Sequence, residues 1–337
     1  MSFKLYKLTG MELNPERFGN REPLYQDVLK LLRNGDVKVE VKDMVSVNVS
    51  GETLWISKNT YEKARGILGG GSSYEAHEGV TLTSARGAWW IIGKPEPVEP
   101  PIGAAKNKEY VRVETKLSRE LGLEPFIVEK DFVFKGFKGE DIEVGRINIS
   151  NKDRYFLLAY KRDGTPLKPE ELQNTFLWKN YLSNREVQNR LGASSSFLRN
   201  KFWHVERMNE RALAKYKVVW RDVADEFIPA VCLDCNDLIP DYTVNYVAVN
   251  SAEEAFYLMA ILLSPQINAV VRELSPWIGH VQPRFLRYFK IPRYSSKNDA
   301  HRRLMEIGRE ISQGENLKNY LGEIEKLVER INEERKK

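Results

Sequence analysis

The sequence predicts an α+β fold, with mixed or antiparallel sheets, packed helices and an amphipathic helix at the C-terminal end. Three observations predict this fold. Valine alternates with other residues between Val37 and Val49, which is the period of strands that bury one face. An apolar run after Ser251 opens with two glutamates, the start of a capped helix. From Ala300 onward, apolar residues recur at helical spacing.

Strands are predicted where β-branched and aromatic residues cluster between glycine, proline or polar breaks. The alternating valines at 37–49 predict a pair of strands. Two apolar segments within 74–92 flank Arg86 and Gly87, which predicts two strands around a turn. Segment 126–144 is strand-like but is interrupted by glycines. The remaining predicted strands cover residues 54–56, 154–160, 217–220, 227–233 and 242–250.

Helices are predicted where apolar residues recur every three or four positions. One helix is expected over 170–189, with its apolar residues on one face, and another over 251–263 with Ser251 as its N-cap. A short helix or turn is expected at 284–289. It is closed by Ile291-Pro292, because the residue before a proline is extended. Further helices are predicted at residues 22–32, 60–68, 266–274 and from 300 to the end.

The last helix carries apolar residues that step by four, three, four and three positions: Leu317, Leu321, Ile324, Val328 and Ile331. This two-heptad pattern has two interpretations. The helix can pack its apolar face on its own domain. It can also form a coiled coil with a partner or with a second copy.

The composition bounds the class of protein. The chain has 337 residues, 42% hydrophobic and 29% charged, so it can bury a core and does not resemble a disordered chain. The net charge of +5 permits nucleic-acid binding without requiring it. The N-terminus has no apolar signal region, and the longest apolar run, 255–263, is too short for a membrane span. We therefore expect a cytoplasmic protein with no membrane contact.

The two cysteines, Cys232 and Cys235, form a single C-x-x-C pair. A zinc site would need histidine ligands, and none of the four histidines stands at finger spacing. Acidic neighbours disfavour a reactive thiolate. We interpret the pair as small buried residues beside a turn in a reducing, intracellular setting, and we expect no metal.

Several catalytic motifs are absent from the sequence. It contains no G-x-x-x-x-G-K-[ST] phosphate loop, no G-x-S-x-G elbow and no H-E-x-x-H helix. An adenine methyltransferase needs Asn/Asp-Pro-Pro-Tyr/Phe, whose polar groups hold the exocyclic amine while the aromatic ring stacks on the flipped base. The double proline here is Glu99-Pro100-Pro101-Ile102, which lacks the amide and the ring. We therefore expect no catalytic residues and no cofactor in this chain.

Five segments carry a family resemblance when they are taken in order: YEAHEGVTLT (74–83), FKGFKGEDI (134–142, followed by Arg146), KVVWR (217–221), AFYLMAILLSP (255–265) and VQPRFL (281–286) with Ile291-Pro292. Over residues 50–335 they resemble the target-recognition region of γ-class N6-adenine DNA methyltransferases and of fused type IIG restriction-modification enzymes. That region is also similar to the specificity subunits of type I systems. Leu263 departs from the pattern, because the family usually has Asn there.

The resemblance implies a target-recognition-domain-like fold and sequence-specific recognition of duplex DNA for an adenine-N6 DNA methyltransferase or a restriction-modification complex. It divides the chain into an N-terminal α+β part at 1–100, a target-recognition domain at 101–297 and a spacer-like helical segment at 298–337. Because the chain begins almost at the recognition region, we expect a partner to supply the methyltransferase catalytic chain and its S-adenosylmethionine. Two other functions stay open, namely a divergent methyltransferase or nuclease and an RNA-binding or scaffold protein.

Two basic stretches are the candidate DNA contacts, because DNA affinity comes mostly from phosphate neutralisation by Lys and Arg. Residues 284–309 contain eight Lys or Arg and two Asp or Glu. Residues 185–211 are looser. They surround the small polar loop 192–196, which can approach a DNA backbone, and they include Phe197, Phe202 and Trp203. The candidate DNA-binding residues are Arg86, Arg190, Ser194, Ser195, Ser196, Arg199, Lys201, Arg284 and Arg287.

Each candidate also has a structural interpretation. The charged residues can lie on a solvated helix face. Arg86 can be a turn residue beside Trp89 and Trp90, which we expect in the core. The glycines at 66–71 follow a predicted helix instead of opening one, so they indicate a flexible turn and not a nucleotide cradle.

Overall fold

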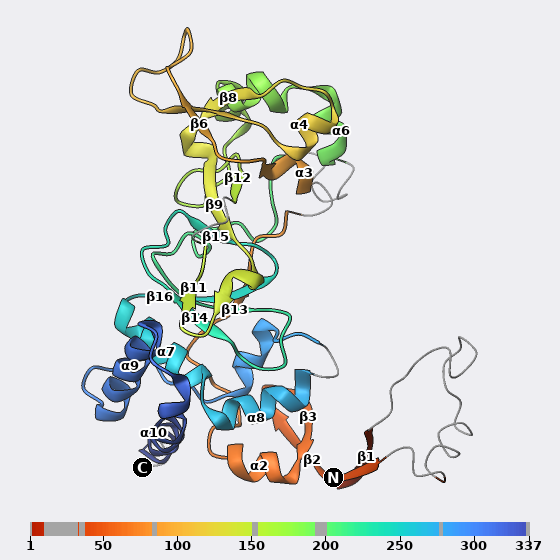
Figure 1. Cartoon of the computed structure of the whole chain (residues 1–337), viewed down its shortest axis with the longest axis vertical. Helices are drawn as coiled ribbons and strands as arrows, with labels where there is room; N and C mark the ends of the chain where they lie inside the picture. The colour runs from red at the N-terminus through yellow and green to blue at the C-terminus, as the bar shows by residue number, and fades with distance from the viewer. Residues whose placement is uncertain are drawn as a thin grey trace.

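The computed structural model describes residues 2–9, 33, 38–82, 86–149, 154–192, 201–275 and 279–334. The molecule is elongated, with a broad lower lobe, an upper lobe and a narrower middle (Figure 1). Each lobe has its own hydrophobic core. The upper core takes its residues from between Val80 and Tyr246, and the lower core from between Val49 and Ile331. Helices and mixed or antiparallel sheets occur together, which confirms the α+β class.

The lower lobe combines a three-stranded antiparallel sheet with most of the long helices. The sheet has the order β1 (Ser2–Thr9), β2 (Lys38–Val49), β3 (Glu52–Ser57). The alternating valines form one long strand and not a pair, because β1 pairs with the first part of β2 and β3 with the second. The helical elements are α2 (Lys58–Ala64), α7 (Ala252–Leu262), α8 (Pro265–Leu274), η7 (Pro283–Tyr288), α9 (Asp299–Ser312), η8 (Leu317–Asn319) and α10 (Leu321–Glu334).

The upper lobe carries two small sheets and short helices. One sheet is antiparallel, with the order β6 (Glu96–Val98), β7 (Tyr110–Val113), β8 (Phe126–Glu129). The other has the order β15 (Leu238–Pro240), β9 (Val133–Phe137), β12 (Tyr155–Leu157), β5 (Trp90–Ile91), with β15 parallel to β9. The helical elements are α3 (Arg86–Trp89), α4 (Lys116–Glu120), η2 (Lys130–Phe132), η3 (Gly139–Asp141), α5 (Pro169–Gln173), η4 (Trp178–Leu182) and α6 (Arg185–Gly192).

One antiparallel sheet in the middle belongs to both cores, and we call it the shared sheet. Its order is β14 (Pro229–Cys232), β13 (Tyr216–Arg221), β16 (Val244–Val249), β4 (His77–Glu78), and the short pair β10 (Ile142–Glu143) and β11 (Arg146–Ile147) packs beside β14. Successive side chains of a strand point to opposite faces. Val219 and its partner Tyr246 therefore enter the upper core, while Val218 and its partner Val247 enter the lower core.

Helix α7 packs on the lower face of the shared sheet and is buried almost throughout. The predicted cap is confirmed, since the Ser251 hydroxyl accepts the backbone N–H of Glu254 at 3.2 Å. Helix α9 packs against α7 at Gly308, where an added Cβ would lie 2.1 Å from the carbonyl oxygen of Phe256. Only a glycine permits this close approach of the two helices.

The apolar residues of the last helix pack against other parts of the same chain. Ile324, Val328 and Ile331 of α10 are buried in the lower core. This confirms the interpretation that the helix packs its apolar face on its own domain. Those three side chains are therefore not exposed for a coiled coil with a partner or a second copy.

Two local predictions were wrong. Residues 170–189 form the separate elements α5, η4 and α6, because Thr175 and Asn184 accept backbone N–H groups and start a new helical turn each time. The predicted turn at Arg86 is helix α3, whose Ala88 carbonyl accepts the Tyr181 hydroxyl at 3.0 Å. The helix expected at 22–32 lies outside the described residues.

The cysteines lie beside a turn and are buried, as predicted, but a disulfide joins Cys232 to Cys235. The expectation of reduced thiols was therefore wrong. Asp234, inside the turn, has a left-handed φ of 55°. The turn brings the two sulfurs together within four residues.

No single helix in the described part of the chain is long and apolar enough to cross a membrane. Helices α7 and α8, which are bent by 62° relative to each other, pass the same length and composition test only as a pair.

Lys217 of the shared sheet supplies a test of the fold. Its side chain is fully buried, and its ammonium donates to the carbonyl oxygens of Ala214 and Cys235 at 2.6 and 2.8 Å. Burial lowers the pKa of Lys217 to about 7, against a smaller opposing effect of Asp237. The unfolded chain then binds more protons than the folded chain between pH 7 and the ordinary lysine pKa, so stability should rise with pH in that range.

We expect the free energy of unfolding in urea to rise by about 1 kcal/mol per pH unit from about pH 7 to 9. The Lys217→Met variant should lack this rise, because it has no titrating group at this position. Parallel pH profiles for the two proteins would show that Lys217 does not titrate in this way.

Candidate nucleic-acid interface

The first candidate group lies on η7, which we call the basic turn (Pro283–Tyr288). Phe285 and Leu286 are buried, while Arg284 and Arg287 are exposed. Residues three apart lie on the same side of a 3₁₀ helix. The two guanidinium groups therefore leave the protein on one face.

The basic turn is fixed by backbone contacts with two neighbouring loops. The Ser50 hydroxyl, at the β2–β3 turn, donates to the Arg287 carbonyl at 3.0 Å. The N–H groups of Gly69 and Gly70 both approach the Tyr288 carbonyl at 3.2 Å. Gly69 and Gly70 have φ values of 127° and 77°, so the predicted flexible turn needs glycine for its conformation. These contacts give the two arginines a defined position.

The Glu52 carboxylate partly neutralises the positive charge of the basic turn. The Tyr288 hydroxyl donates to its carboxylate at 2.7 Å, and the Arg284 guanidinium lies 3.9 Å away. Burial, followed by this hydrogen bond, raises the pKa of Tyr288 to about 12, so the hydroxyl keeps its proton. Among the described residues no carboxylate pairs with Arg287, which leaves it the less neutralised of the two arginines.

The second candidate group lies in the upper lobe. Arg190 on α6 and Lys201 are both exposed, and neither has an acidic partner in the part of the chain that the structure describes. Arg86 begins α3, and its side chain is not among those described. Ser194, Ser195, Ser196 and Arg199 lie outside the described residues. Tyr181 fixes the surroundings of α3, since its hydroxyl donates to the Ala88 carbonyl and accepts from Thr115, each at 3.0 Å.

The aromatic residues of this stretch belong to the core. Trp203 is buried and its indole N–H donates to the Leu167 carbonyl at 3.0 Å, while Phe202 packs against the same core. Trp89 is also buried, as predicted. Phe202 and Trp203 are therefore not placed to stack on bases.

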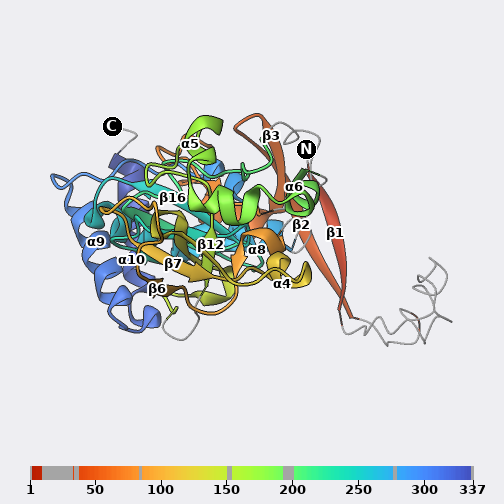
Figure 2. The ribbon, with the colours of Figure 1, turned by 90° about the horizontal axis from the view of Figure 1, so that it is seen from above.

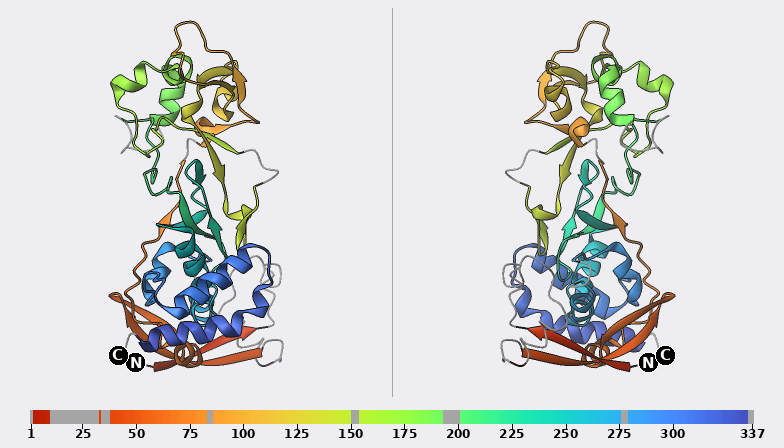
Figure 3. Two further views of the ribbon diagram at one scale, coloured as in Figure 1. Left: turned by 90° about the vertical axis from the view of Figure 1, so that its left-hand side faces the viewer. Right: turned by 90° about the vertical axis from the view of Figure 1, so that its right-hand side faces the viewer.

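The two groups come from different lobes of the molecule. Viewed down the long axis, α6 lies over the β2–β3 part of the lower lobe (Figure 2). In side view, the green helical segment that contains α5 and α6 and the orange β2–β3 hairpin project to the same side of the narrower middle (Figure 3). A long ligand on this side would meet both lobes.

A pocket of about 290 Å³ adjoins the basic turn in the middle of the molecule. It is lined by residues of β4, of the loop after Lys201, of β16 and of η7: Ala76, His77, Glu78, Arg207, Asn209, Tyr246 and Pro283. The Arg207 guanidinium is held through Nη1, which lies 2.5 Å from the Glu78 carboxylate and 2.7 Å from the Thr81 hydroxyl. The structure assigns no partner to Nε or Nη2 among the described residues, so that edge is available to a ligand with two acceptors.

Three further observations set this pocket apart. Arg207 has a left-handed φ of 65°, which is rare for a residue other than glycine and marks a conformation held by its surroundings. The Tyr246 hydroxyl is buried, and no group in the described part of the chain bonds to it. Partial burial and, less strongly, Arg211 lower the pKa of His77. The imidazole is therefore neutral at neutral pH and can accept or donate one hydrogen bond.

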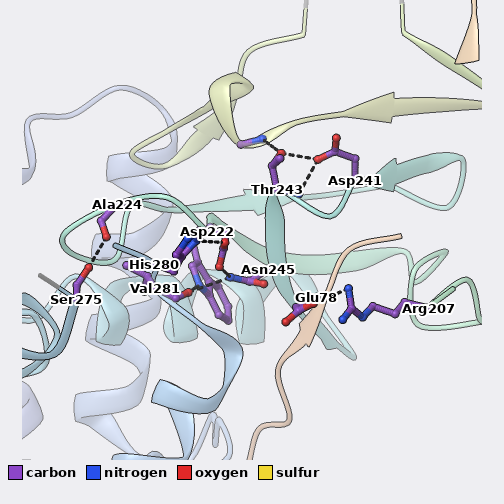
Figure 4. Close-up of polar contacts among 12 residues, drawn as sticks. Glu78, Arg207, Asp222, Ala224, Asp241, Thr243, Asn245, Ser275, His280 and Val281 are labelled. Atoms are coloured by element: carbon purple, nitrogen blue, oxygen red, sulfur yellow. Dashed lines mark hydrogen bonds and ion pairs between the residues drawn. The ribbon is translucent and has the colours of Figure 1, made fainter. Parts of the chain in front are cut away.

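A network of hydrogen bonds positions these elements (Figure 4). The Asp222 carboxylate binds the His280 imidazole at 2.5 Å and the Asn245 amide at 3.0 Å, and Asn245 donates on to the Val281 carbonyl at 2.9 Å. Val281 leads directly into the basic turn. On the other side of the sheet, the Thr243 hydroxyl accepts the Gly139 N–H at 2.9 Å and donates to Asp241. The network thus joins both lobes to the shared sheet.

In the sequence, Arg207 lies within the loose basic stretch 185–211, and Glu78, Tyr246 and His280 are not marked as functional residues. Glu78 and Arg207 are far apart in the sequence and meet only because β4 joins the shared sheet. No motif spacing marks them. In the described residues no group of three or more His, Cys, Asp or Glu side chains is placed to hold a metal ion.

No protein family model and no curated protein matches the chain. Among solved structures it is similar to the type IIL restriction-modification enzyme MmeI in complex with DNA, with a TM-score of 0.42 and 13% identity over 87% of this chain and 39% of that chain. It is also similar to the type IIG restriction endonuclease BpuSI, with a TM-score of 0.40 and 12% identity over 83% of this chain and 35% of that chain. The likeness is one of fold, and the chain spans well under half the length of either enzyme.

A substitution at Gly79 tests how β4 packs beside the pocket. An added Cβ at this position would lie 2.0 Å from the Asp241 carbonyl oxygen, a backbone atom that cannot rotate away. We expect Gly79→Ala to lower the free energy of unfolding by about 1–3 kcal/mol, because it pushes β4 and Glu78 from the shared sheet. Urea denaturation measures this effect.

Gly322→Ala is the matched control, because Gly322 is an exposed helical residue with no atom within 4 Å of its added Cβ. It should leave stability unchanged or raise it slightly. If both variants unfold at the same urea concentration, β4 is not packed as described.

Proposed function

We propose that this chain recognises a specific sequence in duplex DNA on behalf of an adenine-N6 DNA methyltransferase or a restriction-modification complex. One observation carries the proposal. Exposed basic side chains occur in both lobes, on and after α6 and on the basic turn, and a pocket that holds the fixed Arg207 adjoins the basic turn in the middle of the molecule. The ordered family-like segments of the sequence support the same role.

The three parts of this surface suit different parts of a duplex. Arg190, Lys201 and Arg287 are exposed cations without acidic partners among the described residues, as expected of groups that neutralise phosphates. The pocket instead combines the Arg207 guanidinium with the Glu78 carboxylate. A carboxylate repels phosphate but accepts from base amino groups, while an arginine fork donates to paired base acceptors. In this proposal the outer cations position the duplex and the pocket meets base edges.

The proposal assigns methyl transfer to a catalytic region outside these residues. The double proline at Pro100-Pro101 has neither the amide nor the aromatic neighbour that holds a flipped adenine. S-adenosylmethionine would accordingly bind to the methyltransferase partner. A protein with this role works in the cytoplasm, as the sequence analysis expects.

The outer cations make a quantitative prediction. The Arg284→Gln/Arg287→Gln and Arg190→Gln/Lys201→Gln variants should each weaken duplex binding and flatten the dependence of log Kd on log salt by about 1–2. Combining all four changes should flatten it further by a similar amount, because both groups contact the same duplex. Fluorescence anisotropy with a labelled duplex at several salt concentrations measures the slope.

Lys318→Gln/Lys326→Gln removes two exposed lysines from the η8–α10 region and keeps the same net charge as each double variant. It should leave the slope unchanged. Equal effects of this control and of the double variants would mean that only net charge matters, and the surface assignment would be withdrawn.

Sequence recognition itself is tested by selecting bound sequences from a random duplex pool at moderate salt. We expect a single enriched motif, bound more tightly than single-stranded RNA of the same length. Enrichment of no motif by the pure chain, alone and with a candidate methyltransferase, would refute the proposed function. Preference for single-stranded RNA would support an RNA-binding protein instead.

A further inference from the structure

The Glu78 and Arg207 side chains stand at the wall of the pocket beside the basic turn, where a ligand can reach them. They are 39% and 44% exposed, respectively. Figure 4 shows them facing each other, Glu78 from β4 and Arg207 from the loop that follows Lys201. Pro283, the first residue of the basic turn, lines the same pocket. A duplex bound at the basic turn would therefore meet this pair of side chains.

The backbone on both sides of Arg207 is anchored to the upper lobe. The Val205 N–H donates to the Tyr160 hydroxyl at 3.0 Å, and the Glu206 carbonyl accepts the Thr81 N–H at 3.1 Å. Met208 is buried. Between these anchors Arg207 keeps its left-handed φ of 65°, which costs free energy for a residue other than glycine. An exposed ion pair contributes little to stability, so the ion pair with Glu78 does not account for this strained placement.

The pair presents hydrogen-bonding atoms of both kinds. Arg207 Nη1 is occupied by the Glu78 carboxylate and the Thr81 hydroxyl. Nε and Nη2 have no acceptor within the described ranges, and Glu78 Oε1 has no donor there. Two donors in a fixed fork therefore stand next to one acceptor. A carboxylate at this place disfavours phosphate, so the arrangement suits a neutral group with two acceptors and an adjacent donor.

A G·C base pair offers this pattern in the major groove. Guanine presents the acceptors N7 and O6, and the N4 amino group of the paired cytosine is a donor beside them. An A·T pair instead places the adenine N6 amino group opposite the guanidinium, so that two donors face each other. The sign and order of the groups on the protein therefore distinguish the two kinds of base pair.

We propose that Glu78 and Arg207 together read one G·C base pair through the major groove. Arg207 donates from Nε and Nη2 to N7 and O6 of the guanine, while Glu78 accepts from N4 of the paired cytosine. Thr81 is a positioning residue, because it holds Nη1 on the side away from the base. This inference rests on the proposed function and deepens it, since it names a base pair and the two side chains that select it.

The test selects bound sequences from a random duplex pool in parallel for the wild-type chain, Arg207→Gln and Glu78→Gln. The wild-type motif should contain a G·C pair whose preference over A·T falls about tenfold in Arg207→Gln. Glu78→Gln should relax the preference at the same base pair, because it removes the acceptor for cytosine and releases the arginine. Both variants should keep the other positions of the motif.

Modified duplexes test the same contact without changing the protein. Replacing the assigned guanine by 7-deazaguanine removes the N7 acceptor, so it should weaken binding of the wild-type chain about fivefold and leave Arg207→Gln unaffected. Inosine keeps N7 and O6 and lacks only the minor-groove amino group. The wild-type chain should therefore bind the inosine duplex as tightly as the guanine duplex.

Arg65→Gln and Glu62→Gln serve as controls, because they break a comparably exposed ion pair on α2. Both should leave the motif unchanged. Changes at different base pairs in the two pocket variants, or equal wild-type affinity for the guanine and 7-deazaguanine duplexes, would overturn the assignment. A motif that survives both pocket substitutions refutes this inference alone, whereas a wild-type chain that enriches no motif refutes the proposed function together with it.

Discussion

The structure depends on the burial of one sheet from both sides. Strands β13 and β16 run through the middle of the molecule, and their neighbouring residues Val218 and Val219 enter different hydrophobic cores. Such a sheet cannot shift its register by one residue, because every side chain would move to the other core. The register therefore fixes the upper lobe relative to the lower lobe. The distance between surface groups that lie on different lobes is therefore set by this register.

The polar surface is organised around the same sheet. Glu78 stands on its edge strand β4 and holds Arg207, while Asp222, directly after β13, holds the segment that leads into the basic turn. The Arg207 side chain and the backbone of the basic turn thus each have neighbours that set their position. Positions set in advance reduce the conformational entropy that a side chain loses when it binds a ligand. Rigid placement of a few polar groups is what reading a base edge requires, and simple phosphate attraction does not need it.

Sequence alone predicted the elements whose signals are local. The Ser251 cap and the apolar face of α10 follow from capping chemistry and spacing. Prediction of secondary structure from the sequence failed where side chains bond to the backbone, as at Thr175 and Asn184. It also failed at α3, which the hydroxyl of the distant Tyr181 stabilises. The basic stretch around Trp203 also gave no sign that this ring is buried in the core. The Glu78–Arg207 pair could not be predicted from the sequence, because the two residues are far apart in the chain and meet only in the folded shared sheet.

The route of the chain through the shared sheet has an evolutionary consequence. The chain leaves the sheet after β4 and returns to it at β13, and almost the whole upper lobe lies between these points. Entry and exit are both in the sheet, separated only by β16. A replacement lobe of different length or shape would have to match the upper face of that sheet, around Val219 and Tyr246, and the pairing of β15 with β9. This topology would allow the upper lobe to be exchanged as a unit while the lower lobe, with its basic turn, stays the same.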